Sequence, residues 1–466
     1  MTVPLGTALA RVTISTPKRR IDVALPEDLA VAELLPSLLA HAGESAADDG
    51  ERHGGWVLHT ATGTRLASDR NLAGQGVRDG DVLHLVPGRS EWPELEYDDV
   101  VEAIASGARR HGRSWGGPAT RRAALAVGAS ALSLGVVGVA ASGPPWQLPG
   151  GLALGVALLL AVVGTVLARA AGDALAGVAV AAPGLLYAFL GGAVLAAPGG
   201  SQLSDLGAPD LLLGSVTLAA TGLIGYFGVG ARGRAFVAGI AAGLLGLIGG
   251  LLGVLTGMST AGVAAIVLTI GITLLPGYPL LSMRIGKLPM PALPQRTEEL
   301  LRDDPVPRRS EVFAAVARAD EVLTGLLLAV GVVTVVCVGV LLGSADGGSA
   351  PALVVIASLA LLLRGRLFPT PRQRLPLLIG GCVGLALLFA GLALSGAMLL
   401  TLPLALLVGA AVLGAGLLYS RRTPSPYIGR FADILDVLLL VSLLPVACTL
   451  TGFYGYVQGL FASLGR

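Results

Sequence analysis

Few side chains in this sequence could bind a metal or take part in catalysis, and those that could lie far apart in the sequence. The chain has five histidines and three cysteines. The histidines all lie in the first 111 residues, and none has the spacing to another His or Cys that a metal site requires. The cysteines lie far apart in apolar runs without a CxxC pair, which is typical of small buried apolar residues. These residues are His41, His53, His59, His84, His111, Cys337, Cys382 and Cys448.

The sequence also lacks the common motifs of enzymes. It contains no Walker A loop for phosphate, no Ser-His-Asp set and no HExxH metal motif. The net charge of +2 gives no electrostatic footprint for nucleic acid. We therefore predict a protein that is not an enzyme, that has no catalytic residues, metal or cofactor, and that does not bind nucleic acid.

Two acidic residues near the last apolar run are the remaining candidates for chemistry. Asp433 and Asp436 are three positions apart and therefore share one helix face. An ion-coupled transporter needs ionisable groups at mid-depth in the membrane, because the ion must be held there. The two aspartates instead lie at the start of the run, so we expect an interfacial position that faces Arg430 or a partner. Asp173 is likewise expected at the edge of a loop.

The composition indicates which elements must position these residues. Hydrophobic residues make up 54% of the 466 residues, charged residues only 13%, and the mean hydropathy is +0.77. A soluble domain carries about 25% charged residues, so this sequence is that of a membrane protein. Since about 20 apolar residues cross roughly 30 Å of hydrocarbon, the sequence predicts about eleven spanning helices. We place them at 123–141, 148–168, 175–196, 211–230, 235–256, 261–281, 322–342, 351–367, 375–395, 398–419 and 434–454.

The charges of the loops give an independent test of this count, because short cytoplasmic loops collect Lys and Arg. Every second predicted loop is basic, and the loops between them lack Lys and Arg. The long loop at 282–321 belongs to the basic set, while only Arg466 follows the last span. The pattern predicts a multi-pass protein of the cell membrane with a cytoplasmic N-terminus and a C-terminus on the periplasmic side.

Glycine pairs predict the closest helix contact. The chain has 67 glycines, so some GxxxG pairs occur by chance. Four of them fall in the fifth predicted span, where small residues would let two helices approach closely. The pairs are Gly239/Gly243, Gly246/Gly250, Gly249/Gly253 and Gly253/Gly257.

The loop at 282–321 is long for a connection between spans. Its closely spaced prolines at 289, 291 and 294 favour an extended chain. The stretches 297–302 and 310–321 favour helix. Such a charged, proline-rich loop is either a protein contact or a mobile connector. We select Arg308 and Arg309 as its candidate partner-contact residues.

Residues 1–90 differ from the rest and predict a small soluble domain. Alternating apolar residues predict strands near 11–15, 21–25, 56–60 and 82–86, with a short strand at Leu66. Apolar residues from Val31 to Leu39 at helical spacing predict one helix, although Pro36 interrupts it. This order is that of the ubiquitin-like β-grasp, an α+β fold. Residues 91–121 then read as an amphipathic linker that approaches an anionic lipid surface.

A ubiquitin-like domain followed by 122–466 with about eleven spans and a proline-rich loop after the sixth resembles the EccD family. The run 77–85 resembles the end of such ubiquitin-like domains. EccD proteins are membrane components of the type VII (ESX) secretion systems of mycobacteria. The resemblance implies protein export across the inner membrane, a non-catalytic scaffold role, and partners EccB, the ATPase EccC, EccE, lipids and a second EccD copy.

Other functions remain open from the residues alone. The chain continues after its ubiquitin-like part, so docking is favoured over conjugation, which needs a free C-terminal Gly-Gly. A multispan permease with a regulatory β-grasp domain is the main alternative, and a purely structural anchor for a cytoplasmic partner is a third. Transport by the purified protein alone would favour the permease.

Overall fold

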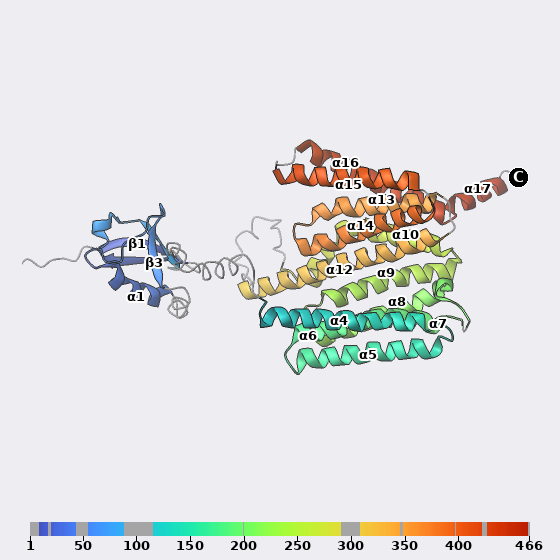
Figure 1. Cartoon of the computed structure of the whole chain (residues 1–466), viewed down its shortest axis with the longest axis horizontal. Coiled ribbons are helices and arrows are strands. Elements are labelled where there is room, and N and C mark those ends of the chain that lie inside the picture. The colour runs from blue at the N-terminus through green and yellow to red at the C-terminus, as the bar shows by residue number, and fades with distance from the viewer. Residues whose placement is uncertain are drawn as a thin grey trace, which may run out of the picture. The chain divides into compact units, whose positions relative to one another are not determined.

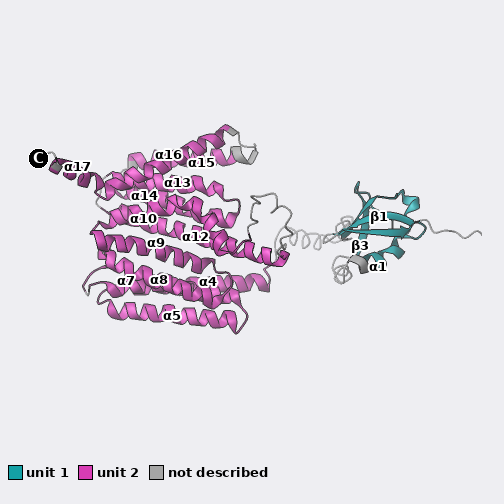
Figure 2. Cartoon of the chain, turned by 180° about the vertical axis from the view of Figure 1, so that it is seen from behind, with its two compact units in different colours: residues 1–114 teal, residues 115–466 magenta. Residues whose placement is uncertain are grey.

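The computed structural model describes residues 9–16, 20–42, 55–87, 115–198, 200–289, 308–344, 348–396, 398–421 and 426–464. The chain divides into two compact units, residues 1–114 and residues 115–466 (Figure 2). Each unit is described by itself. The predicted segments 91–114 and 297–302 lie outside the described residues.

The first unit is a four-stranded mixed sheet with one helix packed on it (Figure 1). The strand order is β2-β1-β4-β3, with β1 antiparallel to β2, parallel to β4, and β4 antiparallel to β3. This topology confirms the predicted ubiquitin-like fold. The elements are β1 (Leu9–Ser15), β2 (Arg20–Pro26), α1 (Val31–Ala42), β3 (Trp56–Thr60) and β4 (Val82–Pro87).

The core of this unit follows the period-2 and helical patterns of the sequence. Val12 and Ile14 on β1 and Leu85 on β4 are buried, together with Leu34 and Leu38 on α1. Alternate strand residues reach one face of the sheet, and α1 covers that face. Pro36 lies inside α1 on its exposed side, so the helix continues through it.

The strand predicted at Leu66 is wrong as an element. The chain makes only a single bridge there, His59 to Arg65, and the Leu66 amide donates to the Leu58 carbonyl at 2.8 Å. One isolated bridge is too short to count as a strand, and an alternation pattern of so few residues does not distinguish the two.

Replacing Leu34 with alanine is expected to destabilise the ubiquitin-like unit by about 2–5 kcal/mol, because the side chain is fully packed in the core. Leu35 is only partly buried, so Leu35→Ala in the same helix is the matched control with a smaller loss. Thermal and denaturant unfolding of fragment 1–90 measures both. Equal losses for the two variants, or a fragment without a cooperative transition, would contradict the expectation.

The second unit confirms the predicted multi-pass architecture. Within the described residues, eleven helices are long and apolar enough to cross a membrane. They lie roughly side by side (Figure 1). Their elements are α4 (Gly117–Ala141), α5 (Gln147–Arg169), α6 (Ala174–Ala181) with α7 (Pro183–Ala196), α8 (Ala208–Val229), α9 (Arg234–Thr256), α10 (Thr260–Thr273) with α11 (Tyr278–Ile285), α12 (Arg309–Gly343), α13 (Ser349–Arg364), α14 (Pro371–Leu394), α15 (Met398–Arg421) and α16 (Pro426–Leu450).

Prolines divide two of the predicted spans. The third span breaks before Pro183, which is the first residue of α7. The sixth breaks at a 3₁₀ turn that contains Pro276 (Leu275–Gly277), between α10 and α11. Proline has no amide N–H to donate and clashes with the preceding turn, which explains both breaks. Pro403 and Pro445 instead lie inside continuous helices.

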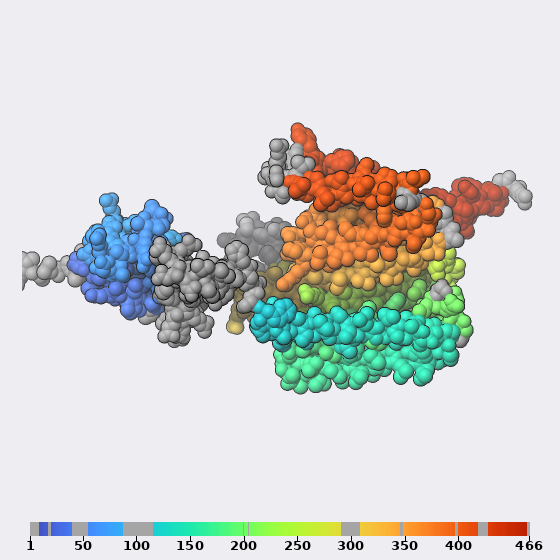
Figure 3. Space-filling view, viewed as in Figure 1, coloured from blue at the N-terminus to red at the C-terminus, as the bar shows by residue number. Residues whose placement is uncertain are grey.

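α12 lies in the middle of the second unit, and α4 and α15 lie at its surface (Figures 1 and 3). The largest apolar core of the unit gathers side chains from α10, α12, α13 and α16, including Leu327, Leu353 and Leu443. None of the described side chains of α4 is buried. Most described residues of α15 are also exposed. The described residues of the chain therefore leave apolar faces of these two helices open.

Candidate helix-packing and partner-contact sites

The glycine face of α9 packs tightly against α8. A methyl group built on Gly243 would lie 2.8 Å from the Ala219 amide nitrogen and the Ser215 carbonyl oxygen. One on Gly250 would lie 2.8 Å from the Leu212 Cα, and one on Gly253 would lie 2.5 Å from the Ala208 Cβ. Because these atoms are mostly backbone of α8, only glycine allows this approach at 243 and 250.

The other glycines of α9 contact side chains or end the helix. A methyl group on Gly239 would meet the Leu185 side chain at 2.9 Å, and one on Gly246 would collide with the Ser215 hydroxyl. Gly249 faces Val267 of α10 in the same way. Gly257 has φ +65° and nothing nearby, so it ends α9 in the left-handed conformation instead of packing.

An apolar cavity lies beside this face. Its volume is about 430 Å³, and α7, α8, α9, α10 and α12 line it. No charged side chain lines it, and its hydroxyl groups come from Ser215 and Thr260. The cavity can therefore accommodate apolar groups, and it offers no carboxylate or basic group to an ion.

Basic side chains gather at one end of the second unit, which we call the arginine-rich end. They lie at or near the ends of the helices there and include Arg121, Arg169, Arg234, Arg364, Arg366 and Arg374. Arg364, at the end of α13, is only 4% exposed. Its Nε donates to Asp436 Oδ1 of α16 at 3.3 Å, and its Nη1 donates to the Ile272 carbonyl of α10 at 2.8 Å. One guanidinium thus joins three helices, and the Ile272 carbonyl lies at the end of α10, where it lacks a regular helical partner.

Asp433 forms the second ion pair of this end, with Arg366. The expectation that the two aspartates face Arg430 is therefore wrong: they pair with arginines at the end of α13. Arg430 is nearest in sequence, but α13 packs directly against α16. A single sequence does not reveal that neighbour. The Asp433 pair is more exposed than the Asp436 pair, with 70% of the Asp433 side chain accessible.

Polar contacts also hold α12 and α4 at this end. The Gln373 amide donates to Asp320 Oδ1 at 2.6 Å, and the Gly233 amide donates to Glu321 Oε2 at 3.1 Å. Asp173 caps α6 and pairs with Arg121 of α4. The hydrogen bond from the Arg121 guanidinium, with that from the Ala176 amide, holds the pKa of Asp173 below its usual range.

α12 extends well beyond its apolar part. It begins at Arg309, so the segment predicted as a separate helix at 310–321 is continuous with the seventh span. Its 35 residues are about 52 Å long, against roughly 30 Å of hydrocarbon. Ala315 and Ala319 are buried on the inner side of this extension. Ala319 packs against Gly286, where an added methyl group would lie 2.8 Å from the Ala319 Cβ.

The outer side of the extension is open. Phe313 is 70% exposed and Val316 is 47% exposed, and they are one helical turn apart. Arg308 occupies the N-cap position and Arg309 is the first helical residue, with both side chains exposed. Two positive side chains and an apolar pair therefore stand together at the start of α12. The adjoining residues 290–307 lie outside the described part of the chain.

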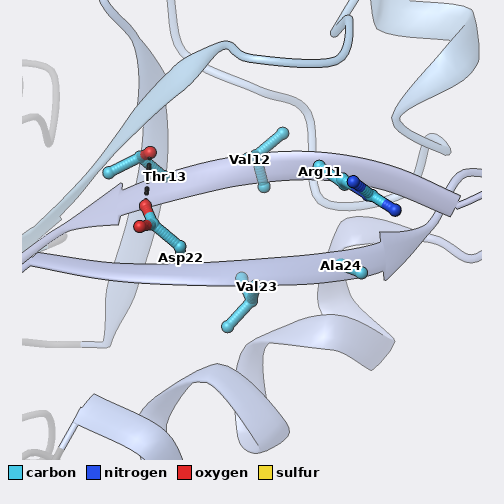
Figure 4. Close-up of a pocket in the computed structure, with 6 residues that line it drawn as sticks. All are labelled: Arg11, Val12, Thr13, Asp22, Val23 and Ala24. Atoms are coloured by element: carbon cyan, nitrogen blue, oxygen red, sulfur yellow. Dashed lines mark hydrogen bonds between the residues drawn. The ribbon is translucent and has the colours of Figure 1, made fainter.

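The ubiquitin-like unit offers a polar surface at strands β1 and β2 (Figure 4). A shallow pocket there is lined by Arg11, Thr13, Asp22 and Ala24 as well as two valines. The Thr13 hydroxyl donates to Asp22 Oδ1 at 2.6 Å. β2 is an edge strand, so charged and polar residues on it limit unwanted strand pairing.

The structure brings His59 and His84 together, which their sequence spacing does not suggest. They face each other in the register of β3 and β4. A register-based pairing is visible only once the strand order is known. Two histidines alone do not make a metal site, and among the described residues no group of three His, Cys, Asp or Glu could hold an ion.

The fold and these sites define a class: a multi-pass membrane protein with a ubiquitin-like domain, whose described polar residues join helices. Residues 120–460 match the EccD-like transmembrane domain family, so the chain belongs to the EccD family. Residues 9–85 match YukD, a protein of the WXG100 secretion system. Both matches agree with the resemblance drawn from the sequence.

Individual relatives cover nearly the whole chain. The ESX-4 secretion system protein eccD4 of Mycobacterium tuberculosis, in strains H37Rv and CDC 1551, is 27% identical, with 97% of each chain covered. Among solved structures, protomer 1 of the ESX-3 core complex has a TM-score of 0.59 at 23% identity, covering 96% of this chain and 100% of that chain. A chain of the MycP5-free ESX-5 inner membrane complex has a TM-score of 0.52 at 22% identity, covering 89% and 100%. These structures share the fold.

Proposed function

We propose that this protein is a non-catalytic membrane component of a type VII (ESX) secretion complex that holds other subunits together. The observation that carries the proposal is the match to eccD4 along 97% of both chains, which includes the ubiquitin-like unit as well as the spans. The polar contacts described for the second unit, such as that of Arg364 with Asp436, join helices, which agrees with this role. The protein belongs in the inner membrane, with protein export as the process it serves.

The orientation belongs to the proposal. The arginine-rich end lies in the cytoplasm, because basic loops stay on that side. The ubiquitin-like unit and the start of α12 then share the cytoplasmic side, and the C-terminus is periplasmic. The partners are EccB, the ATPase EccC and EccE, with a second copy of this chain in the membrane.

Affinity purification of the full chain in mild detergent tests the proposal. The other membrane components of the complex should copurify, and deletion of the gene should stop export of the system's substrates. Fusions of reporter enzymes at residue 1 and after residue 455 should report opposite sides of the membrane. A protein that copurifies with nothing and moves a small solute in vesicles would instead be a permease.

Reversing Arg308 and Arg309 to Glu is expected to weaken copurification of the cytoplasmic ATPase. Charges at a contact tune partner choice, and these two are exposed at the start of α12. Negative charge at a helix N-terminus is favourable, so the reversal stabilises the helix start and does not unfold it. Quantitative copurification measures the loss.

The matched control is the Arg308→Lys, Arg309→Lys variant, which keeps both positive charges and should keep the ATPase. Membrane insertion of all variants should be unchanged in a reporter assay, because orientation depends on the whole pattern of basic loops. Undiminished ATPase recovery with the Glu variant would rule these residues out as the contact.

A further inference from the structure

The chain continues past its last span as a short helix, α17 (Phe453–Leu464), whereas the sequence analysis predicts no element beyond the span at 434–454. α16 has 25 residues and is about 37 Å long, enough to cross the hydrocarbon from the arginine-rich end to the opposite interface. Thr451 and Gly452 join the two helices, and Gly452 has φ +73°. The left-handed glycine ends α16, and α17 begins at the end of the spans opposite to the arginine-rich end and leaves the bundle roughly along their direction (Figure 1).

α17 has two chemically different faces and no charge. Phe453, Val457, Leu460 and Phe461 follow one another at helical spacing and form an apolar stripe. The opposite face consists of small or uncharged polar residues. These are Gly455, Gln458, Gly459, Ala462 and Ser463.

The stripe is open to the surroundings of the protein. Phe461 is 68% exposed and Phe453 is 51% exposed. α17 packs against the end of α16, where the Tyr454 hydroxyl donates to the Pro445 carbonyl at 3.4 Å. The described side chains of the unit therefore leave most of this aromatic surface uncovered, which is unfavourable in water.

We infer that the apolar stripe of α17 binds the phospholipid interface on the side of the membrane opposite to the arginine-rich end. A helix with an apolar face and a polar face lies in the plane of the interface with the apolar face among the acyl chains. α17 would reach this plane by turning at the junction formed by Gly452. Tyr454 and Tyr456 place phenolic rings where aromatic side chains are enriched, at the level of the headgroups.

Lipid fits this surface better than a protein partner does. α17 carries no charged residue that could be matched by a complementary surface. Its first residue is only three positions beyond the end of a spanning helix, so the interface is already within reach. The inference concerns the membrane alone and stands whether or not the proposed secretion role is correct.

Spin labels on the two faces of α17 test the inference in the full chain. The native cysteines are first removed with Cys337→Ala, Cys382→Ala and Cys448→Ala. Leu460→Cys then labels the apolar stripe, and Ala462→Cys labels the opposite face as the matched control. The purified protein is reconstituted without partners into nanodiscs of phosphatidylethanolamine and phosphatidylglycerol, and accessibility to oxygen and to a water-soluble nickel chelate is measured.

The expected result is a several-fold lower accessibility to the nickel chelate at residue 460 than at residue 462, with oxygen accessibility reversed. Equal chelate accessibility at both residues of the protein reconstituted without partners would overturn the inference. Phe461→Trp in the chain with its native cysteines gives a second measurement. The added fluorescence should be quenched by brominated phospholipids, and an unquenched signal would likewise overturn the inference.

Discussion

The Asp436→Asn variant is expected to lose about 3–5 kcal/mol of stability in the membrane domain, the cost of breaking a buried ion pair by removing one partner. Arg364 is 4% exposed, and in the variant the amide oxygen at 436 and the Ile272 carbonyl could still accept its hydrogen bonds, but the negative charge that balances the guanidinium would be lost. The contact that joins α13 to α16 would then become unfavourable. Thermal unfolding in mild detergent, followed by size-exclusion chromatography, measures the loss.

Asp433→Asn is the matched control, one helical turn away in the same helix and with the same change of chemistry. Its pair with Arg366 is largely exposed, so the expected effect is about 0–1 kcal/mol. Adding Arg364→Met to Asp436→Asn should recover part of the stability, since no unpaired charge then remains. Equal effects of the two single variants would show that burial of Arg364 does not matter.

Leucine at Gly250 is expected to separate α9 from α8. Even a methyl group would lie 2.8 Å from the Leu212 Cα, and neither backbone can move away without shifting its helix. Overpacking by small groups costs about 1–3 kcal/mol, and the larger leucine side chain should exceed this range. The same thermal assay measures the loss, and the assembled complex should be recovered in lower yield.

The matched control is Gly155→Leu on α5, a mid-span glycine with open space around it. That variant should be tolerated, because leucine there meets the apolar surroundings of the domain. Gly246→Leu should fall between the two, since the obstacle is the Ser215 hydroxyl, a side chain that can rotate. If Gly250→Leu unfolds at the same temperature as the parent protein, close approach at this position is not required.

The sequence predicts the architecture well because apolar run length and loop charge report directly on the membrane. All eleven spans are present, with ends that shift by a few residues. The exceptions have physical causes. An apolar window ends where charged residues begin, whereas helical hydrogen bonds continue from Val322 back to Arg309, supported by Ala315 and Ala319. The last predicted span ends at 454, so nearly all of α17 falls outside the predicted elements, because its 12 residues are too few to form a further span.

The sites are less predictable, since they depend on which helices become neighbours. The spacing of Asp433 and Asp436 correctly places them on one face, but only the packing of α13 on α16 supplies Arg364 and Arg366. Likewise, the GxxxG pattern identifies a small-residue face on α9 without revealing that backbone of α8 lies opposite Gly243 and Gly250. His59 and His84 meet only through the register of β3 and β4.

Because α12 is one uninterrupted helix, the number of residues that can be inserted into it without changing the direction of its side chains is restricted. Each residue of a helix advances the direction of its side chains by about 100°, because 3.6 residues complete a turn. One residue inserted between Val316 and Glu321 would therefore rotate Phe313 and Val316 by more than a quarter of a circle relative to the buried residues from Val322 onward. An insertion of seven residues would nearly restore the direction while lengthening the rod by about 10 Å. Length changes within this stretch should consequently occur in steps of whole turns.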